Sequence, residues 1–140
     1  MALPAKIALE IVTPDRLIVR EDVDELQAPG ADGYLGVLPG HTPLLATLKV
    51  GELWYRVGQE QHYLAIAGGF IEVLPDRVTV LAQIAERAQE IDVARAEAAR
   101  KRAEERLARP SGDLDFERAR VAMMKSLIRL QVASRARTRV

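Results

Sequence analysis

The composition of the chain changes abruptly near residue 86, and this change limits what the chain can fold into. Glycine, proline and aromatic residues are concentrated before that point, and only Gly112, Pro110 and Phe116 follow it. Charge divides at the same place, because residues 1–85 carry 6 basic and 11 acidic side chains whereas residues 86–140 carry 14 and 9. Such a shift marks a boundary between two structural regimes. We therefore expect two units, residues 1–86 and 87–140.

The first unit has the pattern of a β-structure. Runs rich in valine, isoleucine, leucine and aromatic residues alternate with glycine and proline turns, and no helical period separates them. This pattern predicts an antiparallel β-sandwich or flattened barrel of about eight strands. The expected strands are residues 7–12, 17–20, 23–28, 33–38, 52–57, 62–67, 70–74 and 77–82.

The second unit changes to a helical period. Asp92 is a plausible N-cap, and the run that follows it contains neither glycine nor proline. Pro110 and Gly112 then interrupt the pattern, so we expect a hairpin of two helices, at about 92–108 and 115–135. The first helix has a stripe of mostly small residues at spacings of three and four: Ala96, Ala99, Ala103 and Leu107.

A stripe of alanines buries little area per residue, so it stabilises a helix pair less than a leucine-rich stripe does. The helices are instead supported by intrinsic propensity and by i,i+4 pairs such as Glu97 with Lys101 and Glu105 with Arg109. The sequence therefore predicts a hairpin that docks weakly and acts as a movable arm.

The residues offer little basis for catalysis or metal binding. The chain has no cysteine and only two histidines, His41 and His62, which makes a structural zinc site improbable. No Gly-x-Ser-x-Gly motif and no phosphate-binding Gly-Lys-Ser/Thr motif is present. We expect no enzyme, no metal and no required cofactor.

Nucleic acid and membrane insertion are also not expected. Basic side chains of the second helix lack interleaved aromatic residues for base stacking, so a solvated face or contact with the acidic sandwich is the preferred interpretation. No apolar run approaches the ~20 residues that span a bilayer, and the N-terminus lacks a signal pattern. The basic residues concerned are Arg118, Arg120, Lys125, Arg129, Arg135, Arg137 and Arg139.

Six motifs together resemble the ε subunit family of F-type ATP synthases. The resemblance covers nearly the whole chain in order, and the family's architecture of a sandwich followed by a helical hairpin agrees with the pattern described above. The motifs are LEIVTP at 9–14, GVLPGHTPLL at 36–45, AGGFIEV at 67–73, VTVLA at 78–82, IDVARA at 91–96 and RLQVA at 129–133.

The resemblance implies a non-catalytic subunit of the central stalk, which binds the γ subunit and the membrane rotor ring (c-ring). The segment 31–41 resembles the part that faces the ring, and Tyr34 replaces an acidic residue that many relatives carry there. Trp54 and Tyr55 are either an exposed patch covered by γ or ordinary core residues. The implied ring and γ interface comprises Tyr34, Leu35, Gly36, Pro39, Gly40 and His41.

The hairpin resembles the regulatory element of the family. When extended, its basic second helix is expected to meet acidic surfaces of the α and β subunits and to block ATP hydrolysis. A bias of a few kcal/mol is enough to switch such a two-state element. The residues implied in these contacts are Arg118, Arg120, Lys125 and Arg129.

The family resemblance also implies a regulatory ATP site, because some bacterial members bind ATP through an Ile/Leu-Asp-x-x-Arg-Ala motif. The alternative is that Asp92 only caps the helix. Lys125 stands where the family pattern has an arginine, so the bidentate grip on phosphate is lost there. The implied ATP residues are Glu86, Ile91, Asp92, Arg95, Ala96, Arg102, Lys125 and Arg129.

We therefore expect a rotor subunit that couples ion-driven rotation of the ring through γ to ATP synthesis. Its expected place is the cytoplasmic face of a bacterial plasma membrane, as a peripheral part of the synthase. The first alternative is a free-standing ATP-sensing module. This alternative predicts that the isolated chain binds ATP and is not associated with γ. A nucleic-acid adaptor that uses the basic tail is a further alternative, and it predicts a steep dependence of binding on salt.

Overall fold

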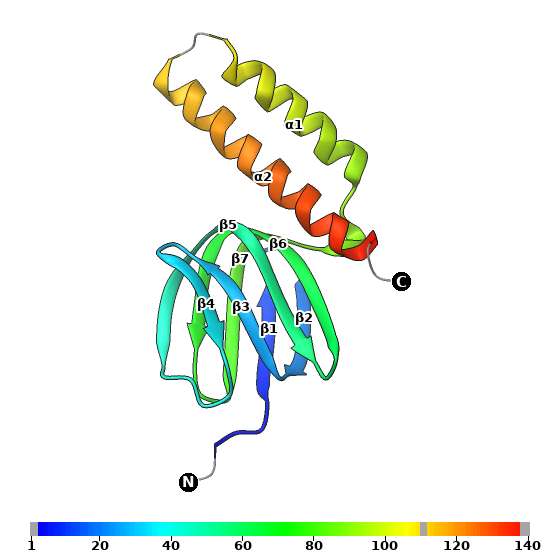
Figure 1. Ribbon diagram of the computed structural model, residues 1–140. Coiled ribbons are helices and arrows are strands. Elements are labelled where there is room, and N and C mark those ends of the chain that lie inside the picture. The colour runs from blue at the N-terminus through cyan, green and yellow to red at the C-terminus, as the bar shows by residue number, and fades with distance from the viewer. Residues whose placement is uncertain (1–2, 110–111, 138–140) are drawn as a thin grey trace. The chain divides into compact units, whose positions relative to one another are not determined.

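The computed structural model describes residues 3–109 and 112–137, with the side chain of Arg137 left out of the description. Two compact units divide the chain, residues 1–87 and 88–140. The first unit contains seven strands, and the second contains a 3₁₀ turn and two helices (Figure 1). Their bounds are β1 Ile7–Val12, β2 Leu17–Val23, β3 Glu25–Gly30, β4 Gly33–Val37, β5 Leu44–Val57, β6 Glu60–Val73, β7 Arg77–Arg87, η1 Ala88–Glu90, α1 Val93–Leu107 and α2 Asp113–Arg137.

The seven strands form one sheet in the order β2-β1-β7-β6-β5-β3-β4. Figure 1 shows that the long strands β5 and β6 curve strongly, which folds the sheet over its own interior. Glycine allows this curvature, because Gly68 and Gly69 in β6 have φ of 80° and 124°. A Cβ on Gly69 would lie only 2.1 Å from the Leu81 carbonyl oxygen, so the backbones of β6 and β7 approach too closely for a side chain.

The interior of the folded sheet is filled by large aliphatic side chains from all seven strands, alternating with exposed neighbours. Leu53 and Ile71 are fully buried, as is Tyr55, which stacks on the ring of His62 at 4.9 Å. Burial raises the pKa of Tyr55. This core makes the first unit an independent folding unit by the usual criterion of its own hydrophobic centre.

The expected fold class, a β-sandwich followed by a helical hairpin, is confirmed. Three details of the sheet differ from the expectation. The strands number seven rather than about eight, because residues 62–67 and 70–74 form the single strand β6 through Gly68 and Gly69. The sheet is not wholly antiparallel, since β1 and β7 pair in parallel from Ala8 with Arg77 to Val12 with Leu81. Strand β5 also begins at Leu44, before the expected residue 52.

The two helices of the second unit pack against each other through small residues. Buried positions recur every seven residues, as Ala96 and Ala103 in α1 and as Ala119, Ser126 and Ala133 in α2. Small side chains at this spacing allow two helices to approach closely over several turns. Ser126 satisfies its hydroxyl within α2 by donating to the Met123 carbonyl oxygen at 2.9 Å.

The ion pairs of the hairpin are local to each helix. Arg100 bridges Glu97 and Glu104, with N–O distances of 2.6 and 2.7 Å. Glu97 therefore pairs with Arg100 rather than with the expected Lys101. The helix α1 begins with Asp92 as its N-cap, whose carboxylate accepts the Arg95 backbone N–H at 3.1 Å. Of the expected helix-terminating residues, Pro110 lies outside the described residues.

Candidate functional site

The segment expected to face the ring forms the β3–β4 hairpin and the loop after it. Gly30 and Gly33 pair across a two-residue turn, and the Ala31 backbone N–H donates to the Thr47 carbonyl oxygen of β5 at 2.8 Å. The loop is fixed at its far end because the Gly40 N–H donates to the Pro75 carbonyl oxygen at 2.7 Å. Backbone hydrogen bonds thus hold residues 31–41 against two other parts of the sandwich.

The six expected interface residues differ in their surroundings. Tyr34 is half exposed and lies over Gly51, with its hydroxyl accepting the Glu52 backbone N–H at 3.4 Å. Lys49 places its Nζ 5.6 Å from the centre of the Tyr34 ring. Leu35 points inward and packs against the core. Gly36 is exposed, and Pro39, Gly40 and His41 are half buried.

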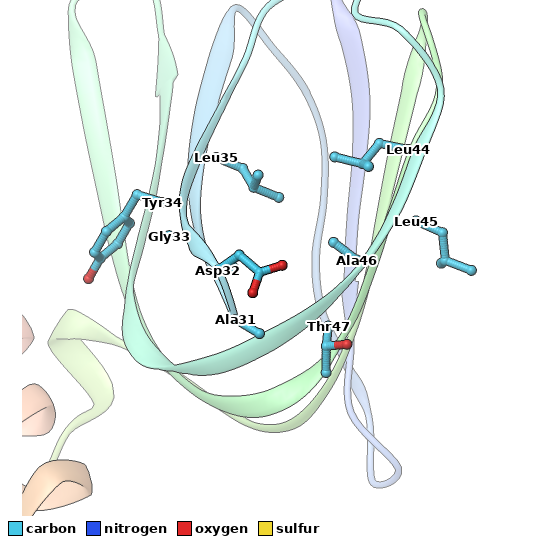
Figure 2. Close-up of a pocket in the computed structure, with 10 residues that line it drawn as sticks. Ala31, Asp32, Gly33, Tyr34, Leu35, Leu44, Leu45, Ala46 and Thr47 are labelled. Atoms are coloured by element: carbon cyan, nitrogen blue, oxygen red, sulfur yellow. The ribbon is translucent and has the colours of Figure 1, made fainter.

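A cavity of about 380 Å³ lies between the β3–β4 turn and β5. Figure 2 shows Leu35, Leu44 and Ala46 around it, with the carboxylate of Asp32 directed into the same space and Tyr34 pointing away. Asp32 makes no hydrogen bond or ion pair with any residue that the structure describes. Asp32 is not among the interface residues predicted from the sequence, because a Gly-Ala-Asp-Gly run is also an ordinary turn sequence.

A row of mostly apolar side chains crosses the outer face of the sheet, and it was also not predicted from the sequence. Thr47, Phe70, Leu81 and Val12 are successive cross-strand partners on β5, β6, β7 and β1. Phe70 and Leu81 are each 55% exposed, and a hollow of about 310 Å³ lies beside them. We call Val12, Thr47, Phe70 and Leu81 the outer row. The sequence contained one signal for this row, which is the alternation of faces along β6. Phe70 lies on the same face as the charged Glu72, and that face is exposed.

The alternative of an exposed aromatic patch at Trp54 and Tyr55 is answered by burial. Tyr55 is fully buried in the core, so the two residues do not form an exposed patch together, and Trp54 lies on the opposite face of β5, where it is half buried.

The residues expected to bind ATP fall into three places. Ile91, Asp92, Arg95 and Ala96 lie together at the start of α1, where Ile91 and Ala96 are buried and Arg95 is exposed. Arg102 is exposed seven residues after Arg95, which places it on the same face of α1. Lys125 and Arg129 lie one turn apart on α2. Glu86 lies in β7 of the first unit.

The basic side chains of the hairpin differ in whether they already have a partner within the chain. Among the described residues, the side chains of Arg95, Arg102, Arg118 and Lys125 form no ion pair or hydrogen bond. Arg120 is held by Glu117 of its own helix at 3.1 Å, and this contact lowers the pKa of Glu117. Arg129 is also engaged. Of the basic residues noted for the hairpin, Arg139 and the side chain of Arg137 lie outside the described part of the chain.

Metal and membrane sites are not evident in the described part of the chain. Residues 3–109 and 112–137 contain no group of three or more histidine or acidic side chains placed to hold a metal ion. Within the same residues, neither α1 nor α2 is apolar enough over its length to cross a bilayer.

Comparison with known families matches both units. Residues 6–88 match the family described as ATP synthase, Delta/Epsilon chain, beta-sandwich domain, and residues 89–134 match its long alpha-helix domain. The ATP synthase epsilon chain of Syntrophobacter fumaroxidans is 55% identical over 93% of this chain and 97% of its own length. That of Solibacter usitatus is 47% identical over 95% and 99%.

Solved structures with the same fold include two from mitochondrial ATP synthases. A chain of the Euglena gracilis OSCP/F1/c-ring structure superposes with a TM-score of 0.82 and 24% identity, covering 98% of this chain and 84% of that one. A chain of the Tetrahymena thermophila central stalk/c-ring structure gives a TM-score of 0.63 and 15% identity, covering 98% and 100%. At these identities the similarity establishes the fold.

Proposed function

The chain belongs to the ATP synthase delta/epsilon family, and from this premise we propose that it is a rotor subunit of the central stalk. Membership makes it an accessory subunit of a membrane-associated synthase, without an active site of its own. The proposed role is to connect the γ subunit to the c-ring, so that ion-driven rotation of the ring reaches the catalytic head. The proposed location is the cytoplasmic face of a bacterial plasma membrane.

The outer row is the observation that carries this proposal. Phe70 and Leu81 are large apolar side chains that a free subunit would leave half in water, beside a hollow that can receive a partner's side chain. Exposed apolar patches of this kind mark protein–protein contacts. The solved relatives support the assignment, since they were determined as parts of central stalk and c-ring assemblies. We assign the outer row to γ and the 31–41 segment to the ring.

Binding of purified γ to the full chain tests the assignment. We expect Leu81→Gln to weaken γ binding at least about tenfold, because a polar group then faces the desolvated centre of the contact. Leu17→Gln is the matched control, since Leu17 is a similarly exposed leucine on the edge strand β2. Equal affinity of the two variants for γ, with both folded, would contradict the assignment.

We further propose that the hairpin restrains ATP hydrolysis through unpaired basic groups of α2. Arg118 and Lys125 have no acidic partner among the described residues, whereas Arg120 is already held by Glu117. The free groups can therefore meet carboxylates of the α and β subunits without first breaking an ion pair. Hydrolysis by the reconstituted synthase should rise in Arg118→Glu and Lys125→Glu more than in Arg120→Ala. No change in hydrolysis in either charge reversal would argue against this role.

A regulatory ATP site on the hairpin is supported by two unpaired arginines. Arg95 and Arg102 lie on one face of α1 and make no ion pair with the described residues, so both can reach phosphate oxygens. The carboxylate of Asp92 accepts the Arg95 backbone N–H as the N-cap of α1. Asp92 therefore stabilises the start of the helix whether or not ATP binds.

Calorimetric titration of the full chain with ATP tests this site. Binding in the micromolar to millimolar range should be lost in Arg95→Ala and kept in Lys101→Ala, which removes a cation from another face of α1. No heat of binding at about 10 mM ATP would leave Asp92 and Arg95 as helix-start residues. ATP binding by a chain that fails to bind γ would favour a free-standing ATP sensor instead.

A further inference from the structure

We propose that Arg87 is a clamp that holds the end of β7 to the edge strand β2, and so fixes the point from which the chain continues into the hairpin. Arg87 is the last residue of β7 and of the first unit, and η1 begins at the next residue. Its Nη2 donates to the carbonyl oxygen of Ile18 in β2 at 2.9 Å, across 69 positions of sequence. A side-chain contact therefore joins the end of the sandwich to a strand near its beginning.

The last part of β7 is paired less completely than the first part. Strand β1 pairs with β7 only as far as Val12 with Leu81. Over residues 82–87, β6 is the one described strand that pairs with β7, and this pairing ends at Leu64 with Arg87. A strand end with a ladder on one side opens more readily than one with a ladder on both sides. The end of β7 therefore needs a further contact if it is to stay in place when the hairpin moves.

Strand β2 offers an acceptor at a β-bulge. Ile11 pairs with Val19 and Val12 pairs with Leu17, so Ile18 is the extra residue and has no paired residue in β1. Among the described strands, none pairs with the other side of β2, which is an edge of the sheet. Ile18 is only 8% exposed, and a buried carbonyl needs a hydrogen-bond donor. The guanidinium supplies this donor from the end of a long side chain.

Charge near the core also favours this position of the guanidinium. Burial raises the pKa of Tyr55, and two nearby charges act on it in opposite directions, since Arg87 lowers the pKa and Glu21 raises it. Both charged groups therefore lie near the Tyr55 hydroxyl, where β7, β2 and β5 meet. Glu21 belongs to the same strand as Ile18, so its negative charge attracts the guanidinium toward β2.

The consequence for the hairpin rests on its proposed regulatory function. While the clamp is closed, the chain can bend only after Arg87. When the clamp is lost, residues 82–87 are free to join the linker, and the hairpin samples more orientations. Docking in one orientation then costs more conformational entropy, so each docked state becomes less populated. Arg87 is therefore a positioning residue for the hairpin, and it acts without touching the hairpin's partners.

Nuclear magnetic resonance of the full, ¹⁵N-labelled chain tests the clamp. Arg87→Met keeps an unbranched stem of similar length but removes every donor. We expect the amides of residues 82–87 to exchange with solvent about tenfold faster in this variant, as for the loss of a hydrogen bond from a charged donor. Relaxation of the α1 and α2 amides should show a shorter rotational correlation time, because the hairpin then reorients more independently of the sandwich. Arg87→Lys retains a charged donor and should restore most of the protection.

Two controls separate a clamp from a general contribution to stability. Arg77→Met removes an exposed arginine from the start of the same strand and should leave exchange over residues 82–87 unchanged. Exchange of the core amide of Ile71 should stay the same in every variant. The proposal is overturned if residues 82–87 of Arg87→Met exchange at the original rate, or if the whole sandwich exchanges faster to the same degree. An unchanged correlation time for α1 and α2 would also overturn it.

ATP hydrolysis by the reconstituted synthase tests the link to regulation. Arg87→Met should raise hydrolysis about threefold, and Arg87→Lys should raise it less, because a looser attachment weakens docking of the hairpin. Faster exchange over residues 82–87 with unchanged hydrolysis would overturn the positioning role of Arg87. The regulatory function fails separately, if Arg118→Glu and Lys125→Glu leave hydrolysis unchanged. The exchange and relaxation measurements use the isolated chain, so their outcome does not depend on that function.

Discussion

The sandwich and the hairpin of this chain are stabilised in opposite ways. The sandwich core consists of large side chains such as Leu9, Leu53 and Ile71, brought together from strands far apart in the sequence. The buried residues that recur every seven positions in the hairpin are alanines and one serine, and the ion pairs of Arg100 and Arg120 join residues three or four positions apart. Burial of large side chains therefore dominates one unit, and local helix-forming tendency dominates the other.

This difference bears on function. A unit held by long-range burial keeps its shape until it unfolds cooperatively, which suits the proposed role of transmitting torque between γ and the ring. A unit whose helices are largely self-supporting loses less when its small-residue contact opens. Such a hairpin can change its partner without losing its secondary structure, which is what the proposed regulatory role needs.

Removal of volume should harm the sandwich most. Leu53→Ala is expected to lower the free energy of unfolding of the first unit by about 3 kcal/mol, because Leu53 is fully buried and leaves a cavity. Chemical denaturation measures the loss. Leu17→Ala, at an exposed position of β2, should change the stability by less than about 1 kcal/mol. A similar loss in both variants would remove the basis of the comparison.

Addition of volume should harm the hairpin next. Ala103 is 2% exposed in the contact with α2, so Ala103→Leu should separate the helices and cost about 2 kcal/mol of local stability. Amide exchange in α1 and α2 would then become about 30-fold faster, while exchange in the sandwich stays as it was. Ala98→Leu is the control on the exposed side of α1. Unchanged exchange in Ala103→Leu would show that the contact is not closely packed.

Loss of the N-cap should have a smaller effect that is confined to the hairpin. Asp92→Ala removes the acceptor for the Arg95 backbone N–H and should cost about 1 kcal/mol at the start of α1. Hydrogen exchange of the first-turn amides of α1 measures this loss of stability. Asp92→Asn can still accept this hydrogen bond and should restore most of the protection. Equal exchange in the alanine and asparagine variants would mean that the cap does not stabilise α1.

Acidification should produce the smallest effect near neutral pH, and it acts on the sandwich. Asp24 accepts hydrogen bonds from the Lys6 Nζ at 2.6 Å and the Gly58 backbone N–H at 2.7 Å, and these contacts lower its pKa below the ordinary value. A carboxyl with a lowered folded-state pKa contributes stability above its unfolded pKa, and this contribution disappears as pH falls through the folded pKa.

Denaturation of the original chain and of Asp24→Asn across a pH series measures that contribution. The original chain should lose more stability than Asp24→Asn between about pH 5 and pH 2, because the variant has no carboxyl to titrate there. Asp76→Asn, in an exposed turn, is the control and should follow the original chain. Parallel curves for the original chain and Asp24→Asn would show that the contacts of Asp24 do not matter to folding.

Local signals were sufficient for much of the architecture. The change of composition near residue 86 separated β from α structure, and Asp92 marked the start of the first helix. Local signals failed at Gly68 and Gly69, which looked like a turn between two strands. In the structure they instead bend one continuous strand, because glycine tolerates the positive φ at both positions and the close backbone of β7 at Gly69.

The candidate sites were less accessible to sequence reasoning than the fold. Arg95, Arg102 and Arg118 could be named from position, but which of the basic groups remain unpaired depends on the contacts of each helix. Asp32 was passed over, since a turn aspartate is common and its direction into a cavity depends on β5. Phe70 and Leu81 were assigned to strands correctly, yet their shared exposure follows only from the register between β6 and β7.

By itself, the sequence determined the two kinds of unit, the positions of most strands and both helices, and the family to which the chain belongs. These properties depend on local composition, periodicity and motif spacing, all of which can be read directly from the order of residues in the sequence. The tertiary structure alone decided the parallel pairing of β1 with β7, the outer row and the cavity at Asp32. Each of these joins residues that are distant in sequence, and their proximity is fixed by strand register and by the bending of the sheet around its core.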